Sequence, residues 1–304
     1  MSRIESLPAE HLGDALTYLL ATPGARQGAA ARQVQVFLDY IQSSPLEWEG
    51  FRIGTSPRWS ALALVLLLPG STVIIMVPTP GEMGIDQRAQ RELTMFVLKQ
   101  LGHRKLNYVQ ALLLPEARGQ RELLRATGFQ HLAPLVYLER AVRYPWVPPP
   151  QVDESEWISF NKDSYDSFAA TLLATYQDSL DCPELSGLRS IEDIIAGHQS
   201  SGVFDPAMWE LLRLDGTCAG CLLLSPLAKT PSVEVVYMAV VPGYRRRGLG
   251  GMLLRRALQL CRQSRARTLT LVVDDRNAPA KALYQCFAFE PTARREAWLY
   301  RWRE

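Results

Sequence analysis

The sequence has few of the residues that mark disulfide-stapled, metal-binding or membrane proteins. Its 304 residues include five cysteines, none of them before Cys182, and four scattered histidines. This distribution argues against a disulfide framework or a metal site and favours a reducing compartment, so we expect a cytoplasmic protein. The apolar runs are too short to span a membrane. Residues 1–20 carry Glu5, Glu10 and Asp14 where a signal peptide would have an uninterrupted apolar core.

The chain also has no excess of charge of one sign. It contains 33 Lys and Arg against 31 Asp and Glu, which gives a formal net charge of +2. This balance provides no bulk attraction for nucleic acid, so any cationic site must be local. We therefore expect a soluble protein whose partners are neither nucleic acid nor membrane.

A proline-rich segment is the clearest break in the chain. Pro145, Pro148, Pro149 and Pro150 lie within six residues, which imposes extended backbone and removes amide donors. The length of the chain is comfortable for two domains of about 150 residues each. We interpret residues 144–154 as a linker between domains 1–143 and 155–304.

The second half predicts an ordered series of helices and strands. Asp215-Gly216 is a strong hairpin signal between two apolar segments, and Ser190 is suited to cap a helix. The expected helices are 165–176, 190–198, 249–263 and 279–287. The expected strands are 157–160, 208–214, 218–224, 233–241, 268–273 and 296–302.

The first half repeats the end of this series, with strand 108–114, helix 120–127 and strand 135–139. Phe129 and Phe289 differ by 289 − 129 = 160 positions, and at that offset Leu123 corresponds to Leu283. An internal duplication explains the correspondence, although two unrelated α/β units can share so short an apolar pattern.

One turn in the second half has the composition that a phosphate site needs. After strand 233–241 the turn reads Arg245, Arg246, Arg247, Gly248, Leu249, Gly250 and Gly251, and a helix follows. Glycines let backbone amides point inward, and a helix start adds partial positive charge. Alone, the turn would also fit other nucleotide-binding proteins or a basic surface loop.

A second segment narrows this prediction. Residues 277–284 read Asn-Ala-Pro-Ala-Lys-Ala-Leu-Tyr, and the two segments together resemble the GNAT superfamily of N-acetyltransferases, whose signature is Arg/Gln-x-x-Gly-x-Gly/Ala followed by Asn-x-x-Ala-x-x-Leu-Tyr. The matching positions are Arg245, Gly248, Gly250, Asn277, Ala280, Leu283 and Tyr284. The resemblance covers residues 157–302. It implies an α/β (α+β) fold of two tandem GNAT-like units, each a mixed, mostly antiparallel splayed sheet flanked by helices.

The resemblance also implies acetyl-CoA as cosubstrate and no metal. Its pyrophosphate would lie on the amides of residues 246–251, and its pantetheine would pair with the backbone of Met238, Ala239 and Val240. The acceptor would be a primary amine of a small molecule or a peptide. Neither its identity nor the oligomeric state follows from the sequence, because acceptor walls come from variable loops.

Direct attack on the thioester needs a deprotonated amine and an acid for the departing thiolate. The resemblance places Tyr284 beside the sulfur as the acid, although a tyrosine on a helix can also serve stability alone. It places the base of histone-type GNAT enzymes at Glu234, the only charge within residues 232–241. Alternatively, Glu234 faces solvent and a water chain removes the proton.

The first half lacks the motif residues. Ala117 and Leu124 stand at the positions equivalent to Asn277 and Tyr284, and residues 84–88 lack the paired glycines. We expect a degenerate, non-catalytic copy and one cofactor for each chain. The alternative for the whole protein is a catalytically silent acyl-CoA sensor or scaffold.

Two further groups of residues carry weaker signals. Cys218 and Cys221 have Cys-x-x-Cys spacing without a second pair, so core cysteines are expected. Within or after the helix 165–176, where GNAT proteins often build the acceptor site, lie Tyr165, Tyr176, Asp178, Asp181 and Glu184. Their carboxylates could attract a cationic amine, but acidic loops are also common on ordinary solvated surfaces.

Overall fold

The structure is a computed structural model that describes residues 3–20, 27–43, 46–56, 58–142 and 155–302. The chain divides into two compact units, which we call the N-terminal unit (residues 1–132 and 295–304) and the C-terminal unit (residues 133–294). The expected linker, 144–154, lies outside the described residues. No helix within the described ranges is long and apolar enough to cross a membrane.

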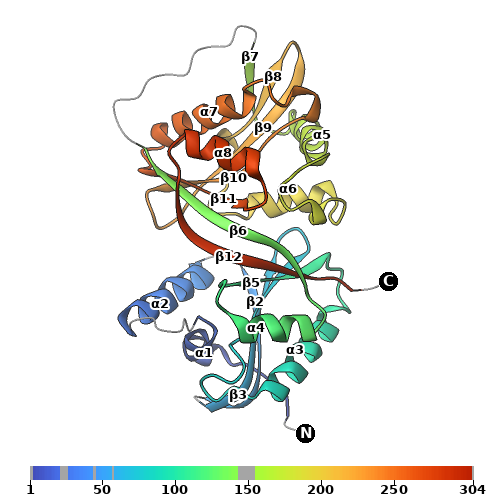
Figure 1. The fold of residues 1–304 in the computed structure, drawn as a ribbon, viewed down its shortest axis with the longest axis vertical. Helices are drawn as coiled ribbons and strands as arrows, with labels where there is room; N and C mark the ends of the chain where they lie inside the picture. The colour runs from blue at the N-terminus through green and yellow to red at the C-terminus, as the bar shows by residue number, and fades with distance from the viewer. Residues whose placement is uncertain (1–2, 21–26, 44–45, 57, 143–154, 303–304) are drawn as a thin grey trace. The chain divides into compact units, whose positions relative to one another are not determined.

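The N-terminal unit is a mixed sheet with helices against it. The strand order is β1-β2-β3-β4-β5-β12, antiparallel except for the parallel pair β4 and β5. The strands are β1 (Glu5–Ser6), β2 (Glu47–Thr55), β3 (Arg58–Leu68), β4 (Thr72–Met76), β5 (Tyr108–Leu113) and β12 (Glu290–Tyr300). The helices are α1 (Leu12–Leu19), α2 (Gln27–Ser43), α3 (Gln87–Leu101) and α4 (Arg118–Ala126), labelled in Figure 1.

The C-terminal unit has the same architecture. Its strand order is β6-β11-β10-β9-β8-β7, antiparallel except for the parallel pair β10 and β11. The strands are β6 (Gln130–Ala141), β7 (Ser155–Ser159), β8 (Trp209–Leu214), β9 (Thr217–Pro226), β10 (Ser232–Val240) and β11 (Thr268–Asp274). The helices are α5 (Tyr165–Tyr176), α6 (Ile191–Gln199), α7 (Leu249–Gln263) and α8 (Ala278–Cys286).

One series of elements therefore occurs twice along the chain. The first copy runs β1, α1, α2, β2, β3, β4, α3, β5, α4, β6, and the second runs β7, α5, α6, β8, β9, β10, α7, β11, α8, β12. The duplication that the sequence predicted from three elements extends over both copies. The expected fold class, two tandem units with mixed sheets flanked by helices, is confirmed.

In each unit, one sheet strand comes from the other copy. The end of the second copy, residues 296–300 of β12, pairs with 109–113 of β5, and residues 135–141 at the end of the first copy pair with β11. The compact units thus differ from a division at the proline-rich segment. The sequence does not predict this exchange of strands, because an apolar strand pattern does not indicate which sheet edge the strand joins.

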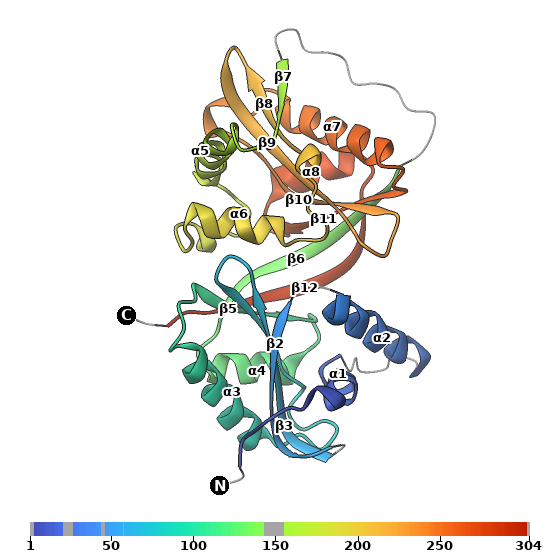
Figure 2. The same cartoon turned by 180° about the vertical axis from the view of Figure 1, so that it is seen from behind.

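In the C-terminal unit, side-chain alternation along β9 separates two apolar clusters. Cys221 and Leu223 pack with Phe168 of α5, whereas Leu222 and Leu224 belong to the cluster of α7. Helices α5 and α6 therefore cover one face of this sheet, and α7 and α8 cover the other, as their labels show in Figure 2.

Candidate active site

Strands β10 and β11 begin as a parallel pair and then separate. Their register runs from Ser232 opposite Thr268 to Val235 opposite Leu271, and no further pair joins their described residues although both strands continue. The separation begins where the pairing of β10 with β9 is irregular, between Val235 and Tyr237. Beyond Val235, one edge of β10 therefore faces a gap.

A cavity of about 640 Å³ occupies this gap. It lies within the range of volumes that hold small ligands and cofactors. Both faces of the sheet contribute to its walls, since α5 and the following loop supply one side and α7 and α8 supply another. The lining residues are Thr175, 178–181, 235–240, 244–246, 248–251, Leu253, 271–273, Asn277, Pro279, Ala280 and 282–284.

The turn after β10 presents free amides to this cavity. Arg246 has φ +65° and Gly248, the cap residue of α7, has φ +79°. Among the hydrogen bonds of the described residues, none uses the amide N–H groups of residues 246–250, whereas the Arg245 and Gly251 amides donate to the carbonyls of Pro242 and Gly248. Amides that are free at a helix N-terminus favour an anion.

The Arg245 side chain turns away from these amides. Its guanidinium donates to the carbonyls of Val240 at 3.0 Å, Thr175 at 3.1 Å, Gln177 at 2.7 Å and Asp178 at 2.9 Å. It thus closes the C-terminal end of α5, where the last carbonyls of a helix lack partners. Arg245 therefore stabilises the conformation of the turn. Its guanidinium already has hydrogen-bond partners in the backbone.

The other basic residues of this region also make internal contacts. Arg247 lies 5.3 Å over the Tyr244 ring and is not among the cavity-lining residues. Arg255 lies 5.6 Å over the Phe287 ring, and Arg256 donates twice to the buried carboxylate of Glu210, at 2.5 and 2.6 Å. Arg246 is exposed and lines the cavity, and its side chain makes no hydrogen bond or ion pair with another residue of the described part of the chain.

Helix α8 places a tyrosine in the cavity wall. The Asn277 side chain caps the helix by accepting from the Ala280 amide at 3.3 Å. Two turns later, Tyr284 is 7% exposed, and its ring centroid lies 5.7 Å from that of Phe289. Burial, reinforced by the negative charge of Asp181, raises the pKa of Tyr284 well above its ordinary value. The phenol is therefore protonated at neutral pH.

Glu234 lies outside the cavity lining. Its neighbours Val233 and Val235 belong to the α7 cluster, so alternation directs Glu234 to the opposite face of β10. There its backbone stands opposite Ser225 and Thr270. Burial raises the pKa of its carboxyl. The structure does not place Glu234 beside Tyr284, so a direct role in the cavity would need an intervening water.

A polar cluster on the α5 face joins Tyr176, one of the residues expected near the acceptor site, to residues outside the sequence motifs. The Tyr237 hydroxyl lies 3.0 Å from Oγ1 of Thr175, and the Tyr176 hydroxyl lies 3.3 Å from Nε2 of His198. The His198 and Tyr237 ring centroids are 5.2 Å apart. Burial lowers the pKa of His198 to about 3, so the ring is neutral. Tyr237 and Thr175 line the cavity, which gives its α5 side hydroxyl groups.

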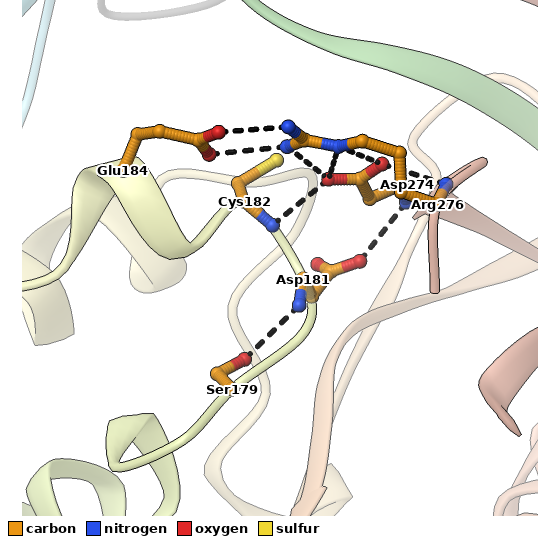
Figure 3. A network of polar contacts seen from close by, with 6 residues as sticks. All are labelled: Ser179, Asp181, Cys182, Glu184, Asp274 and Arg276. Carbon is orange, nitrogen blue, oxygen red and sulfur yellow. Dashed lines mark hydrogen bonds and ion pairs between the residues drawn. The ribbon is translucent and has the colours of Figure 1, made fainter. Parts of the chain in front are cut away.

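The loop after α5 is tied to the end of β11 by a network of charges. Figure 3 shows Arg276 between Glu184 and Asp274, with its guanidinium 2.7 Å from Glu184 and 2.6 Å from Asp274. The Asp274 carboxylate also accepts from the Cys182 amide at 3.2 Å, and Oδ1 of Asp181 accepts from the Asp274 amide at 2.9 Å. The loop is therefore fixed where Asp181 lines the cavity.

The structure shows no metal-binding group in the part of the chain that it describes, counting sets of three or more His, Cys, Asp or Glu. Cys218 and Cys221 are free thiols on β9. Cys221 is fully buried in the α5 cluster, and burial raises its pKa to about 12. It is a core residue, as the sequence indicated.

In the N-terminal unit, an aspartate stands where the C-terminal unit has its glycine-rich turn. Helix α3, the counterpart of α7, is capped by Asp86, whose carboxylate accepts from the Ala89 amide at 2.7 Å. The positions equivalent to Asn277 and Tyr284 are Ala117, which makes no side-chain cap, and Leu124, which is fully buried. This copy therefore has a capped helix start at α3 and no tyrosine at the position equivalent to Tyr284.

Comparison with known proteins agrees with the fold. Residues 172–289 match the acetyltransferase (GNAT) family. The chain is 31% identical over 146 residues to a mycothiol acetyltransferase of Beutenbergia cavernae, a match that covers 47% of this chain and 43% of that protein. It is 40% identical over 58 residues to a putative ribosomal protein bS18 alanine N-acetyltransferase of Bacillus subtilis, which covers 19% of this chain and 38% of that protein. Both matches span less than half of the relative's length.

Solved structures share the fold over nearly the whole chain. A GCN5-related N-acetyltransferase from Sphaerobacter thermophilus superposes with a TM-score of 0.67 at 15% identity, covering 98% of this chain and 95% of that one. A tandem GNAT protein from the clavulanic acid biosynthesis pathway gives a TM-score of 0.56 at 15% identity, covering 99% and 98%.

Proposed function

Because the chain belongs to the GNAT superfamily of acetyltransferases, we propose that its C-terminal unit transfers an acetyl group from acetyl-CoA to a primary amine by direct attack in a ternary complex. The observation that carries this proposal is the cavity between β10 and β11, which has free amides at the α7 end and Tyr284 in its wall. A sensor or scaffold would need the free amides to bind acyl-CoA, but it would not need Tyr284 as a proton donor.

The chain's own groups fit each part of acetyl-CoA. The pyrophosphate would be held by the free amides of residues 246–250 and by the exposed Arg246. The pantetheine amides would pair with the open edge of β10 at Met238, Ala239 and Val240, where β11 has moved away. The cap Asn277 and the small Ala280 lie in the same wall.

The chemistry requires two proton movements. The acceptor nitrogen forms a bond to the acetyl carbonyl carbon, the carbon–sulfur bond breaks, and Tyr284 gives its proton to the departing thiolate. Tyr284 is protonated at neutral pH and can donate, although burial makes it a weaker acid than a free phenol. The amine proton passes through water to Glu234, whose carboxylate is a stronger base than a free one because burial raises its pKa.

The test is acceptor-dependent release of coenzyme A thiol over a panel of primary amines. We expect turnover with at least one amine and a loss of about 100-fold in kcat for Tyr284→Phe, with little change in acetyl-CoA affinity. Full turnover by Tyr284→Phe would contradict the assigned proton donor. Binding of acetyl-CoA without thiol release from any amine would favour the silent sensor or scaffold.

The N-terminal unit is proposed to be catalytically silent. At the start of α3 a carboxylate already occupies the helix end that would bind phosphate, and a second negative group would be repelled there. One acetyl-CoA is therefore expected for each chain.

A further inference from the structure

One aromatic ring in the C-terminal unit contacts two arginine side chains, Arg140 and Arg255, which we call the arginine pair. The Arg255 guanidinium, on α7, lies 5.6 Å from the centroid of the Phe287 ring, and that of Arg140, on β6, lies 6.0 Å from the same centroid. Phe287 follows α8 directly and packs against the α7 cluster. An aromatic face attracts a cation but does not neutralise it. The ring therefore holds two like charges near each other.

Neither guanidinium of the arginine pair is paired with a carboxylate. Within the described residues, no hydrogen bond or ion pair uses the side chain of Arg140 or of Arg255. Burial lowers the pKa of Arg140, and no neighbouring acid opposes this effect. By contrast Arg256, the next residue of α7, donates twice to the carboxylate of Glu210. Two neighbouring cations repel each other, so an anion bound beside them would be stabilised by both.

Arg140 reaches this ring from the first copy of the duplicated series. Val136 and Leu138 of β6 belong to the α7 cluster, and side-chain alternation puts Arg140 on the same face. Arg140 stands opposite Leu269 of β11, which also belongs to that cluster. Because β6 is the last strand of the first copy, that copy contributes one of the two cations to the C-terminal unit.

The arginine pair continues the anion-binding surface of the turn after β10. Gly251 directly follows residues 246–250, whose amides are free. A Cβ atom added at Gly251 would lie 3.7 Å from Nη1 of Arg255 and 3.8 Å from the Phe287 ring. Neither arginine of the pair lines the cavity itself. The pair is therefore next to the amides, but outside the space that would hold the pantetheine.

We propose that the arginine pair binds the 3′-phosphate of coenzyme A, so that the site distinguishes coenzyme A from its 3′-dephospho form. This inference rests on the proposed acetyl-CoA site and names a further group of the donor that the chain recognises. In coenzyme A this phosphate monoester lies beyond the pyrophosphate, at the end opposite the thiol. Such a group carries nearly two negative charges at neutral pH, and guanidinium groups bind it through charge-assisted hydrogen bonds. The first copy, proposed to be catalytically silent, then has a part in binding the donor.

Binding of coenzyme A and of 3′-dephospho-coenzyme A to the full chain, each by calorimetric titration, tests this role. We expect the wild type to bind coenzyme A at least about tenfold more tightly, as charge-assisted hydrogen bonds to a phosphate provide. Arg140→Gln and Arg255→Gln should each reduce this preference, and the double variant should remove it. Their affinity for 3′-dephospho-coenzyme A should stay unchanged, which also reports that the variants are folded.

A matched control separates the arginine pair from bulk charge. Arg265→Gln removes the same charge from an exposed residue beyond the C-terminal end of α7, and it should keep the preference. Retention of the full preference by Arg140→Gln alone would overturn the contribution of the first copy. An equal loss of affinity for both compounds in the variants of the pair would mean that the two arginines only support the fold.

The wild type distinguishes failure of this inference from failure of the proposed function. If neither compound binds to it, the proposed acetyl-CoA site fails and the role of the arginine pair fails with it. If both bind with equal affinity, or if the double variant retains the preference, only the role of the arginine pair is overturned.

Discussion

The guanidinium of Arg245 donates to the backbone carbonyl of Thr175 at 3.1 Å, which joins the turn after β10 to the last turn of α5. The first arginine of the glycine-rich motif is thus a bridge between the wall that would hold the cosubstrate and the wall that would hold the acceptor. Thr175 in turn positions Tyr237 through its hydroxyl. The two halves of the cavity are consequently expected to respond together to changes at Arg245.

Replacing Arg245 by glutamine should therefore weaken both acetyl-CoA and amine binding. The variant loses bonds to the carbonyls of Val240, Thr175, Gln177 and Asp178, and we expect unfolding to become easier by about 1–3 kcal/mol. Urea denaturation measures this loss. The matched control is Arg247→Gln, which gives up only the contact with a tyrosine ring, worth about 0.5–1 kcal/mol at an exposed site. Equal losses in the two variants would refute the bridging role.

Gly248→Ala should lower acetyl-CoA affinity through the backbone. Gly248 has φ +79°, and an added methyl group would meet no other atom within 4 Å, so the strain of the left-handed conformation, about 1–2 kcal/mol, is the main cost. The turn would relax and its free amides would no longer converge. Gly243→Ala, in the same turn region with equal space but no positive φ, is the control. We expect a loss of about tenfold in affinity by calorimetry for Gly248→Ala only.

Arg276→Leu should destabilise the protein far more than Glu184→Gln. Removing the guanidinium leaves Asp274 buried without a cation, which costs about 3–5 kcal/mol, whereas the pair with the half-exposed Glu184 is worth about 0–1 kcal/mol. Chemical denaturation of the two variants compares these values. If Arg276→Leu loses no more than Glu184→Gln, the buried pair does not hold the loop.

The same pair predicts how stability depends on acid. Burial alone would raise the pKa of Asp274, but hydrogen bonds from Arg276 and the Cys182 amide hold it below its ordinary value. Its contribution is therefore present above the unfolded pKa, near 3.9, and is lost as the pH falls through the lower folded value. In Arg276→Leu the folded pKa of Asp274 should rise, because burial then acts without the guanidinium. Thermal melts between pH 5 and pH 3, on either side of the unfolded pKa, should therefore show a smaller loss of stability on acidification than in the wild type.

His198 predicts a second acid-sensitive range at higher pH. Burial lowers its folded pKa to about 3, while the unfolded chain takes up the proton near pH 6.5. The unfolded state binds more protons between these values, so stability should fall as the pH decreases from about 6.5 toward 3. His198→Gln should reduce this slope. An unchanged slope in melting temperature against pH would show that His198 is not held neutral.

Local sequence signals predicted the elements that carry the motifs. The helix 249–263 begins and ends where the sequence places it, because Gly248 and the apolar period both mark it. The hairpin at Asp215-Gly216 and the Ser190 cap, which accepts from the Asp193 amide, are likewise confirmed. In each case the information lies within a few residues of the element.

Features that depend on distant residues were not predictable in this way. β12 begins at Glu290, six residues before the predicted strand, because its polar first half has no apolar alternation to detect. Asp181 and Asp274 are 93 positions apart, and no local pattern links them. The engagement of Arg245 with the end of α5 is equally hidden, since a motif arginine is interpreted as a phosphate ligand until its partners are seen.

The most direct test of the proposed acetyl-CoA site is the stoichiometry of acetyl-CoA binding to the full chain by isothermal titration calorimetry. The free amides at the start of α7 and the capping carboxylate of Asp86 at the start of α3 predict one acetyl-CoA bound per chain. No binding, or two equivalent sites per chain, would contradict the assignment of the cavity between β10 and β11 as the acetyl-CoA site.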